Sequence, residues 1–152
     1  MLDAIVNALI TALCAEGLNA AAKYPAAPLE PGESLVCVSL RSAKLTASGC
    51  GDYIGIGTVD GLVKDMYGSR AEFCAALDIY SPTPDVGQIK NDTYLSLCDI
   101  SSVKLTSFTG DDCVFDAKSG MFLCHCEAKA TACLVRYTAN MRPVYELGEG
   151  DA

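Results

Sequence analysis

The sequence contains no tryptophan and a single histidine, His125, in 152 residues. Histidine is the commonest general acid or base in enzymes, so its scarcity leaves few catalytic arrangements open. A Cys–His or Ser–His pair would have to form around His125 in three dimensions, and no Gly-x-Ser-x-Gly motif is present. We therefore expect no catalytic residues and a protein that is not an enzyme.

Positive charge is also scarce, because 11 Lys and Arg stand against 19 Asp and Glu, which gives a net charge of −8. Such a chain repels nucleic acid and anionic membrane surfaces alike. Asp3 stands where a signal peptide would be basic, and Asp3, Asn7, Thr11 and Glu16 interrupt the first apolar stretch. Neither export nor a membrane span is expected.

The nine cysteines include no Cys-x-x-Cys pair, the spacing typical of zinc sites. Their odd number and irregular spacing favour reduced thiols in the core, with a bridge among them left open. Cys124-His125-Cys126 is the one suggestive cluster. On a strand its two thiols would face one side and the imidazole the other, so we expect no metal there.

Motifs for other cofactors are missing as well. Residues 49–57 hold four glycines, but they form neither a Gly-x-Gly-x-x-Gly motif opening a helix nor a Walker motif. We expect an irregular loop here and no nucleotide. The acidic residues Asp111, Asp112 and Asp116 lack the alternating order of a calcium loop. They are expected to be solvated turn residues, and no cofactor is predicted.

Two amphipathic helices are predicted. Apolar residues from Leu2 to Leu13 recur at steps of three and four, so a helix should cover residues 2–16, with Gly17 ending it in a Schellman-type turn. After Ser81-Pro82-Thr83-Pro84, Asp85 and Gln88 have the spacing of a capping box. This spacing predicts a second helix near residues 85–101.

Strands are predicted over residues 34–41, 104–108, 114–117 and 121–137, with an acidic turn at 110–112. Residues 59–67 and 71–80 are predicted to form a hairpin around Gly68-Ser69. Hydrophobic residues make up 51% of the chain and charged residues 20%, which argues against disorder. The expected architecture is one α+β domain over residues 1–152, with a mainly antiparallel sheet and a frayed tail from about residue 147.

Several short sequences in this order resemble the tail-terminator, or head-to-tail joining, proteins of long-tailed bacteriophages and prophage-derived tail particles. The resemblance follows an amphipathic N-terminal helix and spans about residues 1–137. The sequences that carry it are Tyr24-Pro25, Leu35 to Leu40, Gly51-Asp52-Tyr53-Ile54-Gly55, Lys64 to Arg70 and Ala76 to Pro82.

The resemblance implies structural work in the tail or neck of a virion made in the bacterial cytoplasm. Such proteins form a homo-oligomeric, hexameric ring that caps the tail tube protein, stops its polymerisation and meets the head connector protein. DNA would pass through the acidic lumen without specific binding, and no membrane would be involved. By position, the candidate docking residues are Gly51, Asp52, Tyr53, Ile54, Gly55, Gly68 and Ser69.

Other readings stay open beside this one. Another small protein of the head–tail neck, such as a connector-completion protein, belongs to the same structural class. A cytosolic binding module or an enzyme belongs to a different class. A cavity that brings His125 to a thiol or carboxylate would favour the enzyme, and a monomer that retains a ligand would favour either.

Overall fold

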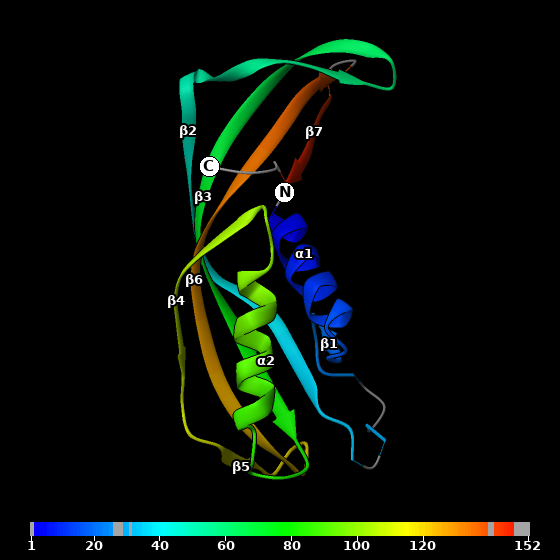
Figure 1. The fold of residues 1–152 in the computed structure, drawn as a ribbon, viewed down its shortest axis with the longest axis vertical. Helices are drawn as coiled ribbons and strands as arrows, with labels where there is room; N and C mark the ends of the chain where they lie inside the picture. Colours follow the sequence, from blue (N-terminus) through cyan, green and yellow to red (C-terminus); the bar gives the residue numbers. More distant parts are fainter. Residues whose placement is uncertain (1, 26–28, 31, 140–141, 148–152) are drawn as a thin grey trace.

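The computed structural model describes residues 2–25, 29–30, 32–139 and 142–147, with 47–55, 59, 136–139 and 142–147 described by their backbone alone. It confirms the predicted α+β class, with a mixed sheet, because one strand pair is parallel. The elements follow in the order α1 (Leu2–Ala15), β1 (Ala20–Ala21), β2 (Leu35–Val59), β3 (Leu62–Ser81), α2 (Gly87–Cys98), β4 (Val103–Gly110), β5 (Val114–Asp116), β6 (Met121–Ala139) and β7 (Arg142–Leu147) (Figure 1).

The sheet is built around β6. One edge of β6 pairs antiparallel with β3, and β3 pairs antiparallel with β2. Along the other edge of β6, β5, β4 and β7 follow one another, each antiparallel to it. The strand order is therefore β1-β2-β3-β6-β4, and among the described strands only β1 pairs parallel, with Val36 and Cys37 of β2.

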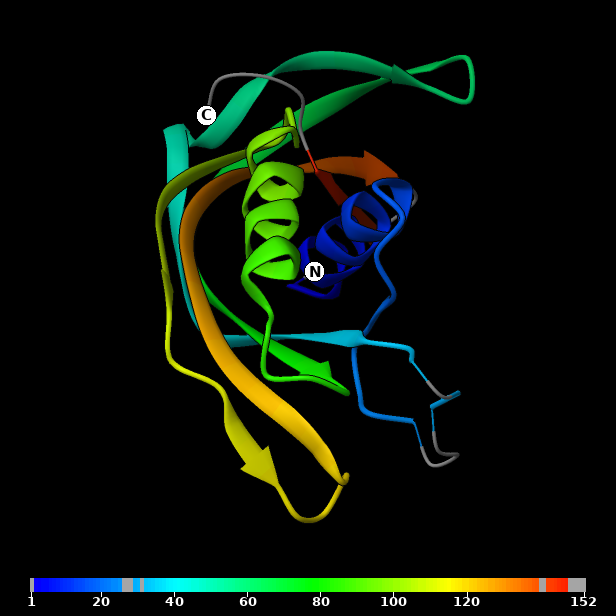
Figure 2. The ribbon, with the colours of Figure 1, turned by 60° about the horizontal axis from the view of Figure 1, so that its bottom comes forward.

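The sheet curves around the two helices, which both lie on its concave face (Figure 2). Two β-bulges lie at nearly the same level of the curve. Arg41 is the extra residue in β2 opposite Cys74 and Ala75, and Thr106 is the extra residue in β4 opposite Lys129 and Ala130. Because a bulge bends its strand and increases the local twist, these two residues account for part of the curvature.

The core lies between the concave face and the helices, and every second residue of β3 over residues 71–79 and of β6 over residues 124–134 points into it. In β3 these residues are Phe73, Ala75, Leu77 and Ile79, as their alternation predicts. The corresponding residues of β6 are small, which lets the helices pack close to the strand. They are Cys124, Cys126, Ala128, Ala130 and Ala132.

Helix α1 contributes Ile5, Leu9 and Leu13 to this core. It ends in the predicted Schellman turn. Gly17, at φ +85°, donates its N–H to the carbonyl of Cys14 at 3.1 Å, and the N–H of Leu18 reaches the carbonyl of Leu13 at 3.1 Å. A positive φ is tolerated best by glycine, so Gly17 fixes where the helix ends.

Helix α2 forms where predicted, but the capping box is wrong. The N-cap residue is Val86, which makes no side-chain cap and is buried in the core. Gln88 instead donates from Nε2 to Oδ1 of Asp92 at 2.8 Å, one turn further along the helix. Because Val86 is buried in the core, it fixes where the first turn of α2 begins. Asp85, which precedes it, is exposed. The helix ends at Cys98, earlier than predicted.

The hairpin predicted around Gly68-Ser69 is also wrong. Strand β3 runs unbroken through both residues, and Gly68 pairs with Ser48 on one side and Val135 on the other. The chain reverses instead at Asp60-Gly61, between β2 and β3. The glycine-rich residues 49–57, expected as an irregular loop, belong to β2, where the register shifts between Ser48 and Gly55.

The two short strands predicted before β6 form, as β4 and β5. Both pair with β6, so the acidic residues Asp111 and Asp112 lie in a break along one sheet edge and do not close a hairpin. The turn into β6 has Gly120 at φ +69°. Residues 148–152 of the predicted frayed tail lie outside the described residues. Within the described part, neither helix is long and apolar enough to span a membrane.

Candidate functional site

A polar cluster covers the convex face of the sheet, opposite the helices. It comes from three neighbouring strands, with Arg41 on β2, Asp78 on β3, and His125 and Glu127 on β6. Asp78 is directly opposite His125 in the register, and Ala76 is directly opposite Glu127. The cluster lines an open groove of about 460 Å³ together with Ser39, Ala76, Thr109, Asp111 and Cys126.

His125 is held by a carboxylate in this groove. Its Nδ1 lies 2.6 Å from Oδ1 of Asp78, and the two side chains are 61% and 29% exposed. The negative charge of Asp78 adds to burial in raising the pKa of the neighbouring Cys37 thiol to about 11. A carboxylate that orients an imidazole is also part of catalytic triads, so the enzyme reading depends on whether a nucleophile lies near.

The second pair in the groove joins Arg41 to Glu127. The bulge in β2 places Arg41 on the convex face, where its guanidinium contacts Oε1 of Glu127. The hydrogen bond from Arg41 is the main cause that lowers the pKa of Glu127. The same carboxylate oxygen accepts a hydrogen bond from the thiol of Cys74 at 3.5 Å.

Cys74 does not complete a catalytic pair with His125. It is opposite Lys129 in the register, four residue pairs along the sheet from the Asp78–His125 pair. Burial, followed by the hydrogen bond to Glu127, raises the pKa of its thiol, which disfavours the nucleophilic thiolate. The groove therefore holds an oriented imidazole but no activated thiol among the residues whose side chains are described.

The Cys124-His125-Cys126 cluster is divided between the two faces of β6, as its alternation predicts. The two thiols lie 3.9 Å apart in the core, while His125 is on the opposite, convex face. Burial, followed by the charge of Cys124, raises the pKa of Cys126 to about 12. Across the described residues, no group of three His, Cys, Asp or Glu side chains is arranged to hold a metal ion.

The three acidic residues before β6 do not form one cluster with a shared role. Oδ2 of Asp116 accepts hydrogen bonds from the backbone N–H and the hydroxyl of Ser119, at 3.3 and 2.8 Å. The hydroxyl hydrogen bond is the main cause that lowers the pKa of Asp116. Asp116 thus stabilises the turn into β6, whereas Asp111 and Asp112 remain exposed at the sheet edge.

A second candidate site is the end of the β2–β3 hairpin. Strand β3 pairs with β6 only from Met66 onward, so residues 56–65 form a two-stranded ribbon, hereafter the arm. The arm extends past the end of β6 at the top of Figure 1. Val59 pairs with Leu62 across a two-residue turn in which Asp60 and Gly61 have φ of +52° and +76°. Positive φ at both turn residues is the requirement of a type I′ hairpin.

The arm exposes large apolar side chains on both of its faces. Ile56 and Val63 share one face and are 65% and 72% exposed, and Leu62 on the other face is 61% exposed. An isolated two-stranded hairpin is only marginally stable in water, and clustered exposed apolar side chains mark interaction sites. The arm therefore has the composition of a surface that a partner covers.

The docking residues predicted from the sequence lie outside this arm. Gly51, Asp52, Tyr53, Ile54 and Gly55 belong to β2 just before the arm, and for all five the backbone alone is described. Gly68 and Ser69 are within the sheet and form no hairpin tip. The sequence reasoning missed Ile56, Leu62 and Val63. The Asp60-Gly61 dipeptide between Val59 and Leu62 was the signal that would have located them.

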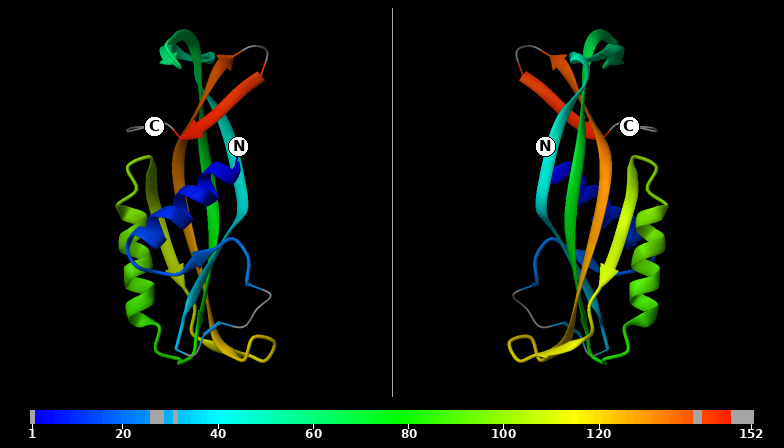
Figure 3. Two further views of the ribbon diagram at one scale, coloured as in Figure 1. Left: turned by 90° about the vertical axis from the view of Figure 1, so that its right-hand side faces the viewer. Right: turned by 90° about the vertical axis from the view of Figure 1, so that its left-hand side faces the viewer.

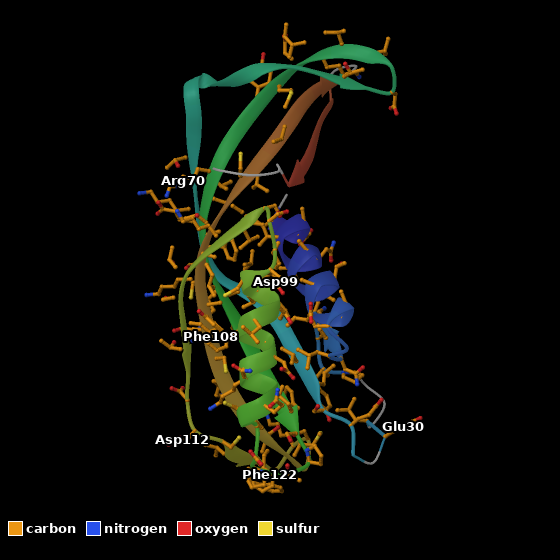
Figure 4. All side chains as sticks on the ribbon, in the orientation of Figure 1. Glu30, Arg70, Asp99, Phe108, Asp112 and Phe122 are labelled. Atoms are coloured by element: carbon orange, nitrogen blue, oxygen red, sulfur yellow. The ribbon has the colours of Figure 1, made fainter. Side chains whose placement is uncertain are left out.

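Further apolar side chains are exposed at the opposite end of the molecule. Phe115 of β5 is 58% exposed and contacts Phe122 edge to face at 5.5 Å, and Val114 is 67% exposed. Figure 4 places Phe122 at this end, far from the arm. Exposed apolar side chains therefore lie at each end of the molecule's long axis.

Comparison with protein-family models and with curated proteins yields no match to this chain.

Proposed function

We propose that the protein is a structural assembly subunit, a bacteriophage tail terminator that caps the tail tube and joins it to the head connector. In this role six copies form a ring in the neck of the virion. The proposal combines the family resemblance of the sequence with the surfaces of the folded chain. The observation that carries it is the arm, with its exposed Ile56, Leu62 and Val63.

The exposed apolar side chains of the arm support a role in assembly. Three large apolar side chains at the end of a two-stranded ribbon gain stability only when another surface covers them. The arm extends beyond the sheet and is therefore accessible to a neighbouring subunit or to the last ring of the tail tube. The exposed Phe115 and Val114 at the far end provide a second contact surface for the opposite neighbour.

The overall charge is compatible with a ring through which DNA passes. A net charge of −8 disfavours phosphate contacts, so DNA would slide through the lumen without sticking. Specific DNA binding is not part of the proposal.

Polymerisation of the tail tube tests this function. Tube subunits from the same phage or prophage region should form tubes of limited length when this protein is added and longer tubes without it, as seen by electron microscopy. A variant with Ile56→Asp and Val63→Asp should stay folded and lose the capping effect. The matched control is Thr58→Asp with Asp65→Asn, which alters polar residues of the same arm face. Tubes that keep their full length with wild-type protein would reject the proposal.

A binding module or an enzyme is the second candidate, and the groove around His125 favours it. An imidazole oriented by Asp78 in a groove of about 460 Å³ is suited to bind or deprotonate a polar ligand. This candidate predicts that His125→Ala abolishes activity or ligand retention and leaves any oligomer intact. The assembly proposal predicts that His125→Ala leaves tube capping unchanged.

A further inference from the structure

We propose that Cys113 and Cys124 form a disulfide bond when a peroxide oxidises the protein, and that this bond fixes the edge strand β5 to β6. Both cysteines are free thiols in the structure. The bond is independent of the proposed function, because it needs only the folded chain and an oxidant. It joins the break between β4 and β5 covalently to the neighbouring strand.

The register of β5 with β6 places the two cysteines opposite one another. Val114 pairs antiparallel with Leu123 at the end of this ladder, so the next residue pair along it is Cys113 with Cys124. Opposite residues of an antiparallel pair direct their side chains to the same face of the sheet. Cys124 is buried in the core, and Cys113 packs against that core. The two thiols therefore meet on the concave face.

The break between β4 and β5 is held against β6 by hydrogen bonds of Asp111. Its N–H donates to the carbonyl of His125 at 2.8 Å. Its carbonyl accepts from the thiol of Cys124 at 3.0 Å and from Nζ of Lys90 on α2 at 2.9 Å. Figure 3 shows α2 beside β4, with the segment that leads into β6 at the lower end of both views. These contacts keep Cys113 close to β6 before any bond forms.

The thiols of Cys113 and Cys124 already interact in the reduced protein. Burial, followed by the charge of Cys124, raises the pKa of Cys113, and a hydrogen bond with the Cys124 thiol adds to this rise. The positive charge of Lys90 opposes it. Because the thiolate is the reactive form, oxidation is slow at neutral pH and becomes faster as the pH rises. Cys113 is half-buried and Cys124 is buried, so a peroxide reaches Cys113 first.

A second thiol, that of Cys126, lies 3.9 Å from the sulfur of Cys124, but its place on the same strand disfavours a bond. Residues two apart on one strand are separated by about 6.8 Å, and their Cβ atoms point the same way. A disulfide needs Cβ atoms about 3.5–4.5 Å apart. Opposite residues of an antiparallel pair have Cβ atoms about 4.5–5.5 Å apart. Cys113 is therefore the partner that requires the smaller movement of the backbone.

Two electrons pass from the thiol pair to one molecule of peroxide. The Cys113 thiolate attacks one oxygen of hydrogen peroxide, the O–O bond breaks, and a sulfenic acid and hydroxide result. This hydroxide takes up the proton that Cys113 released and becomes water. The sulfur of Cys124 then attacks the sulfenic sulfur, so that an S–S bond forms and the S–O bond breaks. The departing hydroxide takes the proton of the Cys124 thiol and leaves as a second water.

The bond closes a loop over residues 113–124, which contains β5 and the turn at Gly120. Strand β5 is three residues long and pairs with β6. The exposed Val114 and Phe115 follow Cys113 directly. Because a cross-link restricts the open states of the segment that it closes, amide hydrogen exchange of residues 114–116 should slow about tenfold in the oxidised protein.

Peptide mass spectrometry without reduction tests the bond, after treatment with hydrogen peroxide and alkylation of the remaining thiols in denaturant. The wild-type protein should yield linked peptides, lighter by two hydrogen atoms than the free ones and separated by dithiothreitol. Fragmentation of the linked peptides distinguishes Cys124 from Cys126. Cys113→Ser should abolish the link. Cys98→Ser, which alters an exposed cysteine at the end of α2, is the matched control and should keep it. Circular dichroism shows that each variant is folded.

Hydrogen exchange of the oxidised wild-type protein measures the effect on β5. A Cys113–Cys124 link with slower exchange in residues 114–116, reversed by dithiothreitol, supports the inference. A link between Cys124 and Cys126, or one that persists in Cys113→Ser, overturns it. Oxidation of Cys98 while Cys113 and Cys124 stay reduced overturns it as well. A Cys113–Cys124 link that leaves exchange unchanged overturns the effect on β5.

Discussion

Nδ1 of His125 and Oδ1 of Asp78 lie 2.6 Å apart, across the pairing of β6 with β3. The pair is on the convex face, away from the core that the flanking residues Cys124 and Cys126 help to form. The only histidine of the chain is therefore partnered by a carboxylate on the face of the sheet opposite the core.

The pair should contribute little to stability. His125→Ala and Asp78→Asn are each expected to change the free energy of unfolding by less than about 1 kcal/mol, because polar pairs at an exposed surface exchange their contact for contacts with water. Urea unfolding of both single variants and the double variant measures the coupling. A coupling of several kcal/mol, or loss of a measured activity in His125→Ala, would show that the groove is a functional site.

Periodicity located most of the fold because the core follows it directly. The alternation in β3 and β6 and the apolar stripe of α1 each place buried residues on one face, and the Schellman turn needs only Gly17 and its neighbours. These features depend on residues that are close together in the sequence. The sequence therefore predicted the α+β class and the order of the main elements.

The β2–β3 hairpin was misplaced for a physical reason. Gly68-Ser69 has the composition of a turn, but both neighbouring strands pair across it and keep it extended. At Gly68-Ser69 the strand pairing outweighed the local preference for a turn. At Asp60-Gly61 the local preference and the strand pairing both favour a turn. The convex-face pairs were beyond prediction as well. Asp78 and His125 are 47 residues apart in sequence, and only the register of the sheet brings them together.

Stability should depend on pH through Glu127. The hydrogen bond from Arg41 holds the pKa of Glu127 below its ordinary value of 4.5 in the folded protein. The stabilisation is therefore present above pH 4.5 and is lost as the pH falls through the lower, folded-state value. Glu127→Gln should be less stable than wild type at pH 7, and the difference should shrink in acid. Urea unfolding at pH 7 and pH 3 measures it, and an equal difference at both pH values would contradict the assignment.

The turn of the arm should be sensitive to a side chain at Gly61. Gly61→Val places a β-branched residue at φ +76°, which costs about 1–2 kcal/mol locally. Amide hydrogen exchange should become faster in residues 56–65 and stay unchanged in β6. Gly87→Ala is the matched control, because Gly87 begins α2 with ordinary φ and room for a methyl group. Equal exchange in both variants would show that the turn does not need glycine.

The cysteines should differ in their reactivity toward alkylating agents. Cys14 and Cys98 are exposed, whereas Cys124 and Cys126 are buried and the pKa of Cys126 is raised to about 12. Because the thiolate is the reactive form, iodoacetamide at pH 7.5 should modify the exposed pair first. Peptide mass spectrometry of briefly treated native protein reads the order. Modification of Cys126 as fast as Cys98 would contradict the described core.

The native mass of the purified protein tests the assembly account most directly. Light scattering coupled to size-exclusion chromatography, at concentrations up to those of a tail-assembly reaction and with tube subunits present, should detect a particle of six 15.9-kDa chains. The Ile56→Asp and Val63→Asp arm variant should lose the association with tube subunits. A chain that stays monomeric throughout, with and without the tube protein, would contradict the account.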